Sequence, residues 1–501
     1  MGEGSLFTLL EVIFKFAFFL KNLHLVLFSS GNRGECSKIR HNQNEITNCK
    51  GSFNNPTPFI SIAMVLYSPG RTSSYPNEAV KEGIRFHFLG GGNEVGNVGC
   101  IIEDVAGTRL LLDYGLAPTK PPRYPNEAPK VTDCIITHSH IDHLGMAPWL
   151  ASHHSTRLHG TALTGEIAMP MWNDCYKVSR IEGYPLSWDK RDIDEAVDLW
   201  QSHGFNEKIT FHNWKWRLLP AGHIPGAAMV NIDTPTHRIL FTGDFDTRDS
   251  KLVHGAEPVE CDILFVEGTY GGRSHPPKKP EQERFLNRVT EVVSRGGTCL
   301  VPAFANGRTQ DVLMLLHQNK PNLNIHIDGM GKFLAKLYLE HPEYLRSSEE
   351  LEAAMIWAKK VSSKSDRKKA LDADVIITTS GMLDGGPSIW YMNRLRDNPN
   401  NAILLTGYQA RGSGGRKLLD EGKLPIFGTD IPIELEVDQF TFSTHCGHDE
   451  IISFTKQCKA KHVVVYHTDP DQARPPLVAA LESQGHTVHC PVNGESYTII
   501  D

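Results

Sequence analysis

Histidine and aspartate side chains crowd into one short segment, THSHIDHLG, which begins at Thr137. It contains His138, His140, Asp142 and His143, although only 24 of the 501 residues are histidine. Imidazole nitrogens and carboxylate oxygens are the usual nitrogen and oxygen ligands of catalytic zinc. Because the first two histidines are two positions apart at the expected end of a strand, their side chains should point the same way. The segment predicts a metal site, with a polar surface turn as the alternative interpretation.

Three other residues occupy comparable positions in the chain. His223 lies in the sharp loop of LLPAGHIPGA, Asp244 closes RILFTGD, and His467 closes VVVYH. Each of them alone is more often a structural polar residue at a strand end. As a set they supply what a two-metal site requires, namely several histidines and one carboxylate that can bridge.

Short apolar runs precede these residues and predict the strands that position them. The earliest run, with Ile84, Phe86 and Phe88, alternates as a strand does and leads into a glycine-rich turn. Helical patterns are expected at 280–295, 307–319 and 472–485. Ligands in α/β folds bind beyond the ends of buried strands, on loops that the sheet holds in place. The pattern therefore predicts an α/β protein whose metal site lies at strand ends.

The overall composition is that of an ordinary globular chain with room for two or three domains. Hydrophobic residues make up 40% and charged residues 22% of the chain, and the formal net charge is -7. An acidic chain does not attract nucleic acid by its overall field, so RNA binding would need a local basic groove or bound metal. The ten cysteines are scattered without a C-x-x-C pair, which favours buried reduced thiols in a cytoplasmic protein.

Residues 1–80 are expected to form a poorly ordered or appended segment. Its apolar stretch is interrupted by Glu11, Lys15, Lys21 and His24, whereas a spanning helix needs about 20 mostly apolar residues. An amphipathic or poorly ordered extension is the preferred interpretation, and we expect no stable membrane insertion. The stretch that follows, to about residue 77, is rich in Ser, Asn, Gly and Pro and has the composition of a linker.

With these motifs, the sequence resembles the metallo-β-lactamase superfamily, and specifically its β-CASP ribonuclease family, over roughly residues 84–501. That family includes the nuclease of the cleavage and polyadenylation specificity factor and its prokaryotic relatives. The branch is indicated by VEGTYGG, FTFSTHCGHDE, PAFANGRTQ, TTSGML and GYQARGSGGR. The sequence departs from the family pattern at Gly268, where Ser is usual, at Thr468, where Gly is usual, and at Phe245.

The resemblance implies a fold and a division of the chain. The expected fold is an α/β protein, a metallo-β-lactamase αββα sandwich with an inserted α/β β-CASP domain. The sandwich would comprise residues 81–270 and 433–501, and the inserted domain residues 271–432.

The resemblance also implies roles for individual residues. His138, His140 and His223 would hold one of two Zn²⁺ ions, Asp142, His143 and His467 the other, and Asp244 would bridge them. Asp113 in LLLDYG would orient a ligand or the water. His445, oriented by Glu267, would be the general acid, although a core histidine paired with a glutamate is the plainer interpretation. The expected RNA contacts are Arg308, Ser380, Gly381, Tyr408, Arg411 and Arg416.

The expected activity is zinc-dependent hydrolysis of RNA phosphodiester bonds by a metal-bridging hydroxide, in RNA processing or decay, in endonuclease or 5′-to-3′ exonuclease mode. The alternatives are a zinc hydrolase of small esters or thioesters, a nuclease acting on DNA, and a non-catalytic scaffold subunit of an RNA-processing complex. The expected partner is single-stranded RNA, and a homodimer or an RNA-processing complex stays open. The basic stretch 359–369 is by default a solvated helix face, with a basic rim for RNA as the alternative.

Overall fold

The computed structural model describes residues 75–184, 186–426 and 428–500, together with the backbone of 39–41 and 44–46. The chain divides into two units, residues 1–66 and 67–501. In the first, β1 (Ile39–His41) pairs in antiparallel fashion with β2 (Asn44–Ile46). The predicted amphipathic extension lies outside the described residues. Among the helices that are described, none is both long and apolar enough to cross a membrane.

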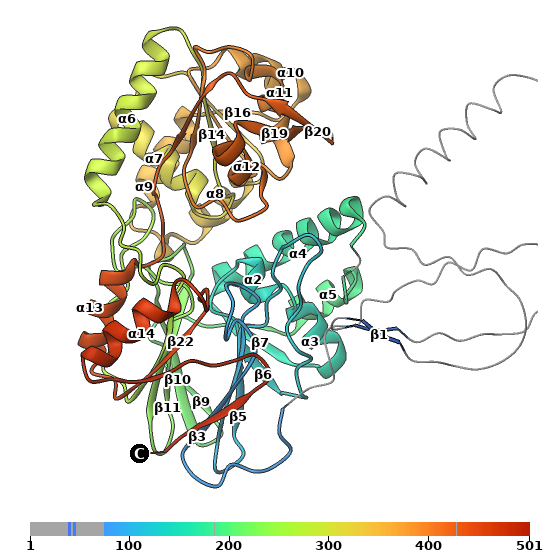
Figure 1. The fold of residues 1–501 in the computed structure, drawn as a ribbon, viewed down its shortest axis with the longest axis vertical. Helices are drawn as coiled ribbons and strands as arrows, with labels where there is room; N and C mark the ends of the chain where they lie inside the picture. Colours follow the sequence, from blue (N-terminus) through green and yellow to red (C-terminus); the bar gives the residue numbers. More distant parts are fainter. Residues whose placement is uncertain (1–38, 42–43, 47–74, 185, 427, 501) are drawn as a thin grey trace, which may run out of the picture. The chain divides into compact units, whose positions relative to one another are not determined.

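Two mixed sheets of seven strands lie face to face in the second unit (Figure 1). The first sheet has the order β24 (Ser496–Ile499), β3 (Ile84–Gly90), β4 (Gly99–Asp104), β5 (Arg109–Leu112), β6 (Asp133–Ile135), β7 (Arg157–Gly160), β8 (Trp200–Ser202). The second has the order β23 (Thr487–His489), β22 (His462–Tyr466), β13 (Ile263–Glu267), β12 (Arg238–Phe241), β11 (Ala228–Asp233), β10 (Trp214–Pro220), β9 (Ile209–Phe211). The C-terminal strand β24 thus pairs with the first strand of the sandwich.

Large apolar side chains from both sheets fill the space between them. Phe86 and Phe88 from β3 meet Phe265 from β13, and the rings of Phe86 and Phe265 pack edge to face with centroids 5.4 Å apart. These side chains are fully buried. Such aromatic pairs contribute stability beyond that of the area they bury, so this layer helps to hold the two sheets together.

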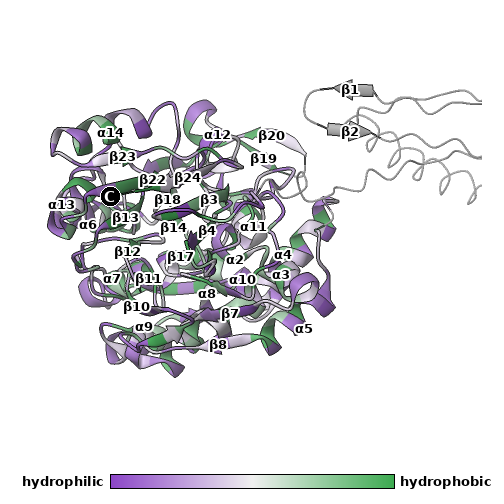
Figure 2. Cartoon of the chain, turned by 90° about the horizontal axis from the view of Figure 1, so that it is seen from below, coloured by the Kyte–Doolittle hydropathy of each residue, from purple (hydrophilic) through white to green (hydrophobic). Residues whose placement is uncertain are grey.

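Helices cover the two outer faces of the sandwich. The first sheet carries α2 (Ile141–Leu144), α3 (Ala147–His154), α4 (Ala162–Glu182) and α5 (Lys190–Asp198), and the second carries α13 (His448–Cys458) and α14 (Arg474–Ser483). Figure 2 shows the corresponding hydropathy, with hydrophobic strands such as β13 and β22 inside and hydrophilic residues on helices such as α5 and α13. This arrangement is the predicted αββα sandwich.

A third sheet belongs to the insertion between β13 and β22, and all its strands are parallel. Its order is β16 (Lys359–Lys360), β15 (Ile325–Asp328), β17 (Val375–Thr378), β14 (Cys299–Pro302), β18 (Ala402–Leu405), β21 (Glu436–Gln439). One face is covered by α6 (Lys278–Ser294), α7 (Arg308–Asn319), α8 (Gly331–Glu340) and α9 (Ser348–Trp357). The other face carries α11 (Gly386–Leu395), α12 (Gly414–Glu421) and, at its edge, the short α10 (Lys364–Lys369). The hairpin β19 (Lys423–Ile426) and β20 (Thr429–Pro432) follows α12.

Helices bury both faces of this third sheet. Successive residues of each strand point to opposite sides, so neighbouring residues pack against different helices. In β17, Val375 and Ile377 join the cluster with α7 and α8, whereas Ile376 joins the cluster with α11. The predicted helices 280–295, 307–319 and 472–485 correspond to α6, α7 and α14. Strand β21 pairs with β18, so the inserted sheet continues beyond residue 432, where we expected the insertion to end.

Candidate metal centre

The candidate ligands lie on loops that leave one edge of the two facing sheets. His138 and His140 follow β6 in a loop rather than in the strand itself, and His140 is the N-cap of α2. The first turn of α2 therefore presents Asp142 and His143. His467 comes directly after β22, and β13 separates β22 from β12, the strand that precedes Asp244. The buried strands fix where each loop begins.

One cluster contains His138, His140, His223 and Asp244, whose potential ligand atoms all lie within 4.8 Å of one another. Nδ1 of His140 is 3.1 Å from Nε2 of His138 and 3.1 Å from Nε2 of His223. A neutral imidazole has one N–H, so His140 can satisfy only one of these neighbours by a hydrogen bond. Ligand nitrogens around tetrahedral zinc lie about 3.3 Å apart, given Zn–N distances of about 2.0–2.1 Å. The spacing fits a shared cation.

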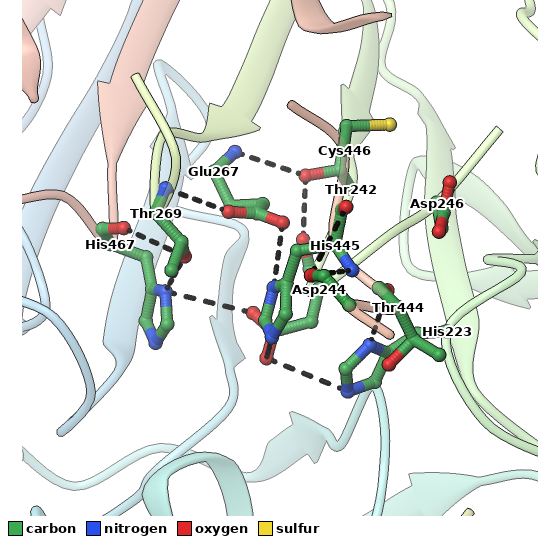
Figure 3. Close-up of polar contacts among 12 residues, drawn as sticks. His223, Thr242, Asp244, Asp246, Glu267, Thr269, Thr444, His445, Cys446 and His467 are labelled. Carbon is green, nitrogen blue, oxygen red and sulfur yellow. Dashed lines mark hydrogen bonds and ion pairs between the residues drawn. The ribbon is translucent and has the colours of Figure 1, made fainter. Parts of the chain in front are cut away.

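Asp142, His143 and His467 form a second cluster. Figure 3 shows Asp244 between His467 of this cluster and His223 of the first. The Asp244 oxygen Oδ2 lies 3.5 Å from His138 Nε2, while Oδ1 lies 3.2 Å from His143 Nε2. Asp244 Oδ1 and His143 Nε2 are both buried and have no hydrogen-bond partner among the described residues. Two orphaned buried atoms that face each other fit ligands of a cation, because burying them unpaired is otherwise costly. The donor set thus suits two metal ions bridged by Asp244.

Asp113 contacts the His143 ring at Nδ1, opposite the Nε2 atom that faces Asp244. Its Oδ2 accepts a hydrogen bond from Nδ1 of His143 at 2.8 Å, and its Oδ1 accepts one from the backbone N–H of Thr137 at 2.7 Å. Burial disfavours the protonated ring, but Asp244 and Asp113 outweigh it and raise the pKa of His143. Asp113 and His467 both have positive φ angles, 57° and 49°, which non-glycine residues rarely adopt. Strained backbone at two such residues is typical of functional sites.

His445 and Glu267 form a pair next to this centre (Figure 3). Nδ1 of His445 lies 3.0 Å from Oε1 of the buried Glu267, and its Nε2 points to Asp244, 4.0 Å from Oδ2. Burial lowers the pKa of His445, but the carboxylates of Glu267 and Asp244 overcome this and raise it to about 9. The geometry suits a histidine that gives a proton to a group held at the centre.

The two departures from the family pattern next to this pair lie in contact with each other. A Cβ at Gly268 would come within 3.0 Å of Cβ of the buried Thr468. The Thr468 side chain thus takes the space that a serine at position 268 would need. Gly268 and Thr468 therefore form a matched replacement for the usual Ser and Gly, and neither disturbs Glu267.

The six predicted RNA contacts have different surroundings. Tyr408 and Arg411 are exposed, whereas Arg416 is half-buried and pairs with Asp420 one helical turn away. Ser380 and Gly381 lie in the loop after β17. Arg308 is largely buried, with its guanidinium 3.5 Å from Asp311.

Sequence reasoning missed two features. Thr137 opens the histidine-rich segment, yet its hydrogen bonds to Asp113 could not be read from the segment itself. Asn306 lies in PAFANGRTQ, and its Nδ2 donates to Oγ of Ser139 at 2.8 Å. This bond joins the loop after β14 in the insertion to the loop that carries His138 and His140. A polar residue in a loop gives no sign of such a partner far along the chain.

Comparison with known protein families agrees with this architecture. Residues 95–303 match the metallo-beta-lactamase superfamily, residues 309–418 the Beta-Casp domain, and residues 430–491 the Zn-dependent metallo-hydrolase RNA specificity domain. The chain is also similar in fold to a protein of unknown function from Enterococcus faecalis, with a TM-score of 0.55 and 14% identity over 83% of this chain and all of that one.

Several curated proteins are similar along most of their length. "Probable RNase MJ4" of Methanocaldococcus jannaschii is 33% identical over 82% of this chain and 99% of its own. "RNase aCSPSF2" of Saccharolobus solfataricus is 32% identical over 82% and 85%. "Cleavage and polyadenylation specificity factor 73" of Drosophila melanogaster is 27% identical over 77% of this chain and 60% of its own. The chain belongs to the β-CASP family of the metallo-β-lactamase superfamily.

Proposed function

We propose that this protein is a zinc-dependent ribonuclease that hydrolyses RNA phosphodiester bonds. The observation that carries the proposal is the position of Asp244, whose two oxygens face separate histidine clusters beside the His445–Glu267 pair. Relatives aligned along nearly their whole length are named as RNases, which supports RNA as the substrate. The protein is a metal-dependent hydrolase of this family, and it acts in RNA processing or decay.

The metal set that we propose is two Zn²⁺ ions. His138, His140 and His223 would hold one and Asp142, His143 and His467 the other, with Asp244 shared. Bound there, zinc would neutralise charge on a phosphate and lower the pKa of a water molecule towards neutrality. Imidazole and carboxylate donors with no cysteine suit catalytic zinc, whose sites keep a position open for water or substrate.

The residues of the chain then have distinct tasks. Asp113 fixes the ring of His143 so that Nε2 faces the centre. The backbone carbonyl of Thr444 accepts from Nδ1 of His223, which leaves its Nε2 for the metal. His445 donates a proton to the leaving ribose oxygen, and Glu267 orients the ring and stabilises its charged form. We keep Tyr408, Arg411, Ser380 and Gly381 as contacts for the strand on the inserted domain.

Two other functions account less well for these features. A hydrolase of small esters or thioesters has no use for the inserted domain, whose loop contacts the metal-binding loop through Asn306 and Ser139. A non-catalytic scaffold needs no complete set of donors around Asp244, yet this chain has one. Digestion of single-stranded RNA, single-stranded DNA and a thioester by the zinc-loaded protein separates these possibilities. Thioester hydrolysis without RNA cleavage would overturn the proposal.

We also propose a cytoplasmic protein that binds single-stranded RNA. The cysteines at the described positions are all unpaired and most are buried, which supports a reducing compartment. One relative is named as a subunit of a specificity factor, which supports work within an RNA-processing complex. Co-purification of the tagged protein tests this, since a complex would bring stoichiometric partners with it.

A further inference from the structure

A pocket of about 410 Å³ opens in the inserted domain, apart from the residues of the metal centre. It lies beyond the carboxyl end of β15 and is bordered by the segment after β16 and by the start of α11. The chain leaving β15 enters α8 on one face of the sheet, whereas the chain leaving the neighbouring β17 enters α11 on the other. Ligands of parallel sheets bind in the crevice at such a point.

The local backbone suits a negatively charged group. Strand β15 passes into α8 through Gly329, Met330 and Gly331, and the pocket is bordered by Gly329 and Lys332. Gly329 has a φ angle of 102°, and a Cβ there would come 2.1 Å from Thr379 Oγ1, so the tight turn requires glycine. Neither α8 nor α11 has a side-chain cap. In α11, however, Pro387 has no N–H and the N–H of Ser388 donates to the carbonyl of Thr379, so the N–H groups that can face an anion are those at the start of α8.

Basic side chains surround the same pocket. Lys332, Lys364 and Arg367 line it, together with the hydroxyl-bearing Ser362 and Ser363. The buried Asp328 takes a bidentate contact from Arg367, at 2.7 and 3.2 Å, and lies 3.8 Å from Lys332. Asp328 therefore partly neutralises two of the cations and fixes the guanidinium. Lys364 is exposed and has no ion pair among the described residues, so it is free to bind a ligand.

The charge of this segment contrasts with that of the whole chain. Residues 359–369 contain six lysine or arginine residues and one aspartate, while the full sequence has a net charge of -7. The single acid, Asp366, accepts hydrogen bonds from the backbone N–H and hydroxyl of Ser363, the N-cap of α10, and so completes a capping box. A concentrated positive field beside a polar pocket is suited to phosphate.

The pocket shares its sheet edge with the loops over the metal centre. Strand β17 separates β15 from β14, whose following loop bonds to Ser139 in the metal-binding loop. Adjacent strands are about 4.8 Å apart, so one RNA strand could span both places.

We infer that this pocket binds a backbone phosphate of the RNA, several nucleotides from the bond that is cut. This inference rests on the proposed function. Lys364 and the first turn of α8 make the contact, and Arg367 and Asp328 hold the pocket open. Proteins that bind single-stranded nucleic acid without sequence preference use basic grooves that follow its phosphate backbone. Within the segment 359–369, the pocket-lining Lys364 and Arg367 thus form the basic rim for RNA, whereas Lys369 lies on the solvated face.

The test measures the affinity for RNAs of graded length, from about 4 to about 16 nucleotides, by fluorescence anisotropy. The zinc-loaded His445→Ala protein serves as background so that the RNA stays intact. In that background Lys364→Glu should weaken binding of the long RNAs about tenfold, as expected for loss of one charged contact. The slope of log affinity against log salt should also fall by about 0.7. Binding of the shortest RNAs should not change.

Lys369→Glu is the matched control, because Lys369 lies on the same exposed helix but does not line the pocket. It makes the same change in charge and should leave the affinity and the salt slope nearly as they were. Equal losses in the two variants, or none in either, would overturn the inference while leaving the proposed function intact. Absence of RNA binding at every length in the background protein would instead refute the proposed function.

A parallel titration with ATP and inorganic phosphate distinguishes an RNA phosphate from a free nucleotide. Weak or no binding of both, with the length-dependent loss for RNA, is the expected result. Tight ATP binding that Lys364→Glu abolishes, with RNA affinity unchanged, would show that the pocket takes a small nucleotide and would overturn the inference.

Discussion

Replacing Asp113 by asparagine changes one atom of the metal centre's support and leaves its shape intact. In the native site Oδ1 of Asp113 accepts from the backbone N–H of Thr137, and Oδ2 accepts from His143 Nδ1 and from the Thr137 hydroxyl. To keep the backbone bond, the amide oxygen of asparagine must take the place of Oδ1. The amide NH₂ then faces Nδ1 of His143, so two donors meet.

The loss of binding free energy follows from this meeting of two hydrogen-bond donors. The Thr137 hydroxyl can turn and accept, but His143 must lose its bond or move its proton to Nε2, the atom that faces Asp244. A hydrogen bond to a charged group contributes about 1.5–3 kcal/mol, which corresponds to about 10- to 150-fold in affinity. Loss of such supporting contacts typically weakens metal binding about 10- to 100-fold. We therefore expect Asp113→Asn to bind one zinc ion per chain about 10- to 100-fold more weakly.

The assay titrates zinc into metal-free protein in competition with a chelating dye that resolves the two sites. The site of His138, His140 and His223 should keep nearly its native affinity. Asp133→Asn is the control, because Asp133 is also a buried carboxylate but binds Arg157 instead of a candidate ligand. Two zinc ions bound with native affinity in Asp113→Asn would refute the role assigned to Asp113.

Three further changes test other parts of the account. His445→Ala should keep both zinc ions and reduce turnover by about 10²–10⁴-fold, as loss of a general acid does. Loss of zinc in this variant would mean that His445 is a ligand. Glu267→Gln should also keep both zinc ions and show a smaller loss of turnover. Asn306→Ala removes the bond to Ser139 and should lower kcat/KM about fivefold, for a bond of about 1 kcal/mol, with zinc content unchanged; native kcat/KM would show that the bond does not position the metal-binding loop. Phe265→Ala opens a cavity between the two sheets and should lower the free energy of unfolding by about 3–5 kcal/mol in chemical denaturation, whereas a loss below about 1 kcal/mol would contradict the packing described.

Much of the site could be predicted because its residues follow buried strands. The rule that functional side chains lie where strands end marked Asp244 and His467, more than 200 positions apart in the chain, as candidates, and the resemblance to the family implied their roles as ligands. The structure brings all seven predicted ligands into two adjoining clusters. The sandwich and its inserted α/β domain also agree with the prediction.

The remaining features depend on partners distant in sequence. Nothing in NGRTQ indicates that Arg308 folds inward against Asp311, which reduces its access to RNA. The predicted end of the insertion at residue 432 precedes β21, because a polar four-residue strand at a sheet edge has no clear hydrophobic pattern. The match between Gly268 and Thr468 depends on three-dimensional contact, so the sequence shows only two separate departures.

The most direct test of the central claim is digestion of end-labelled single-stranded RNA by protein of known zinc content. With two zinc ions per chain the account predicts cleavage, its loss after chelation, and its return when zinc is restored. The positions of the labelled products would also identify the endonuclease or exonuclease mode. Cleavage that persists without metal, or RNA left intact by protein with its full zinc content, would contradict the account.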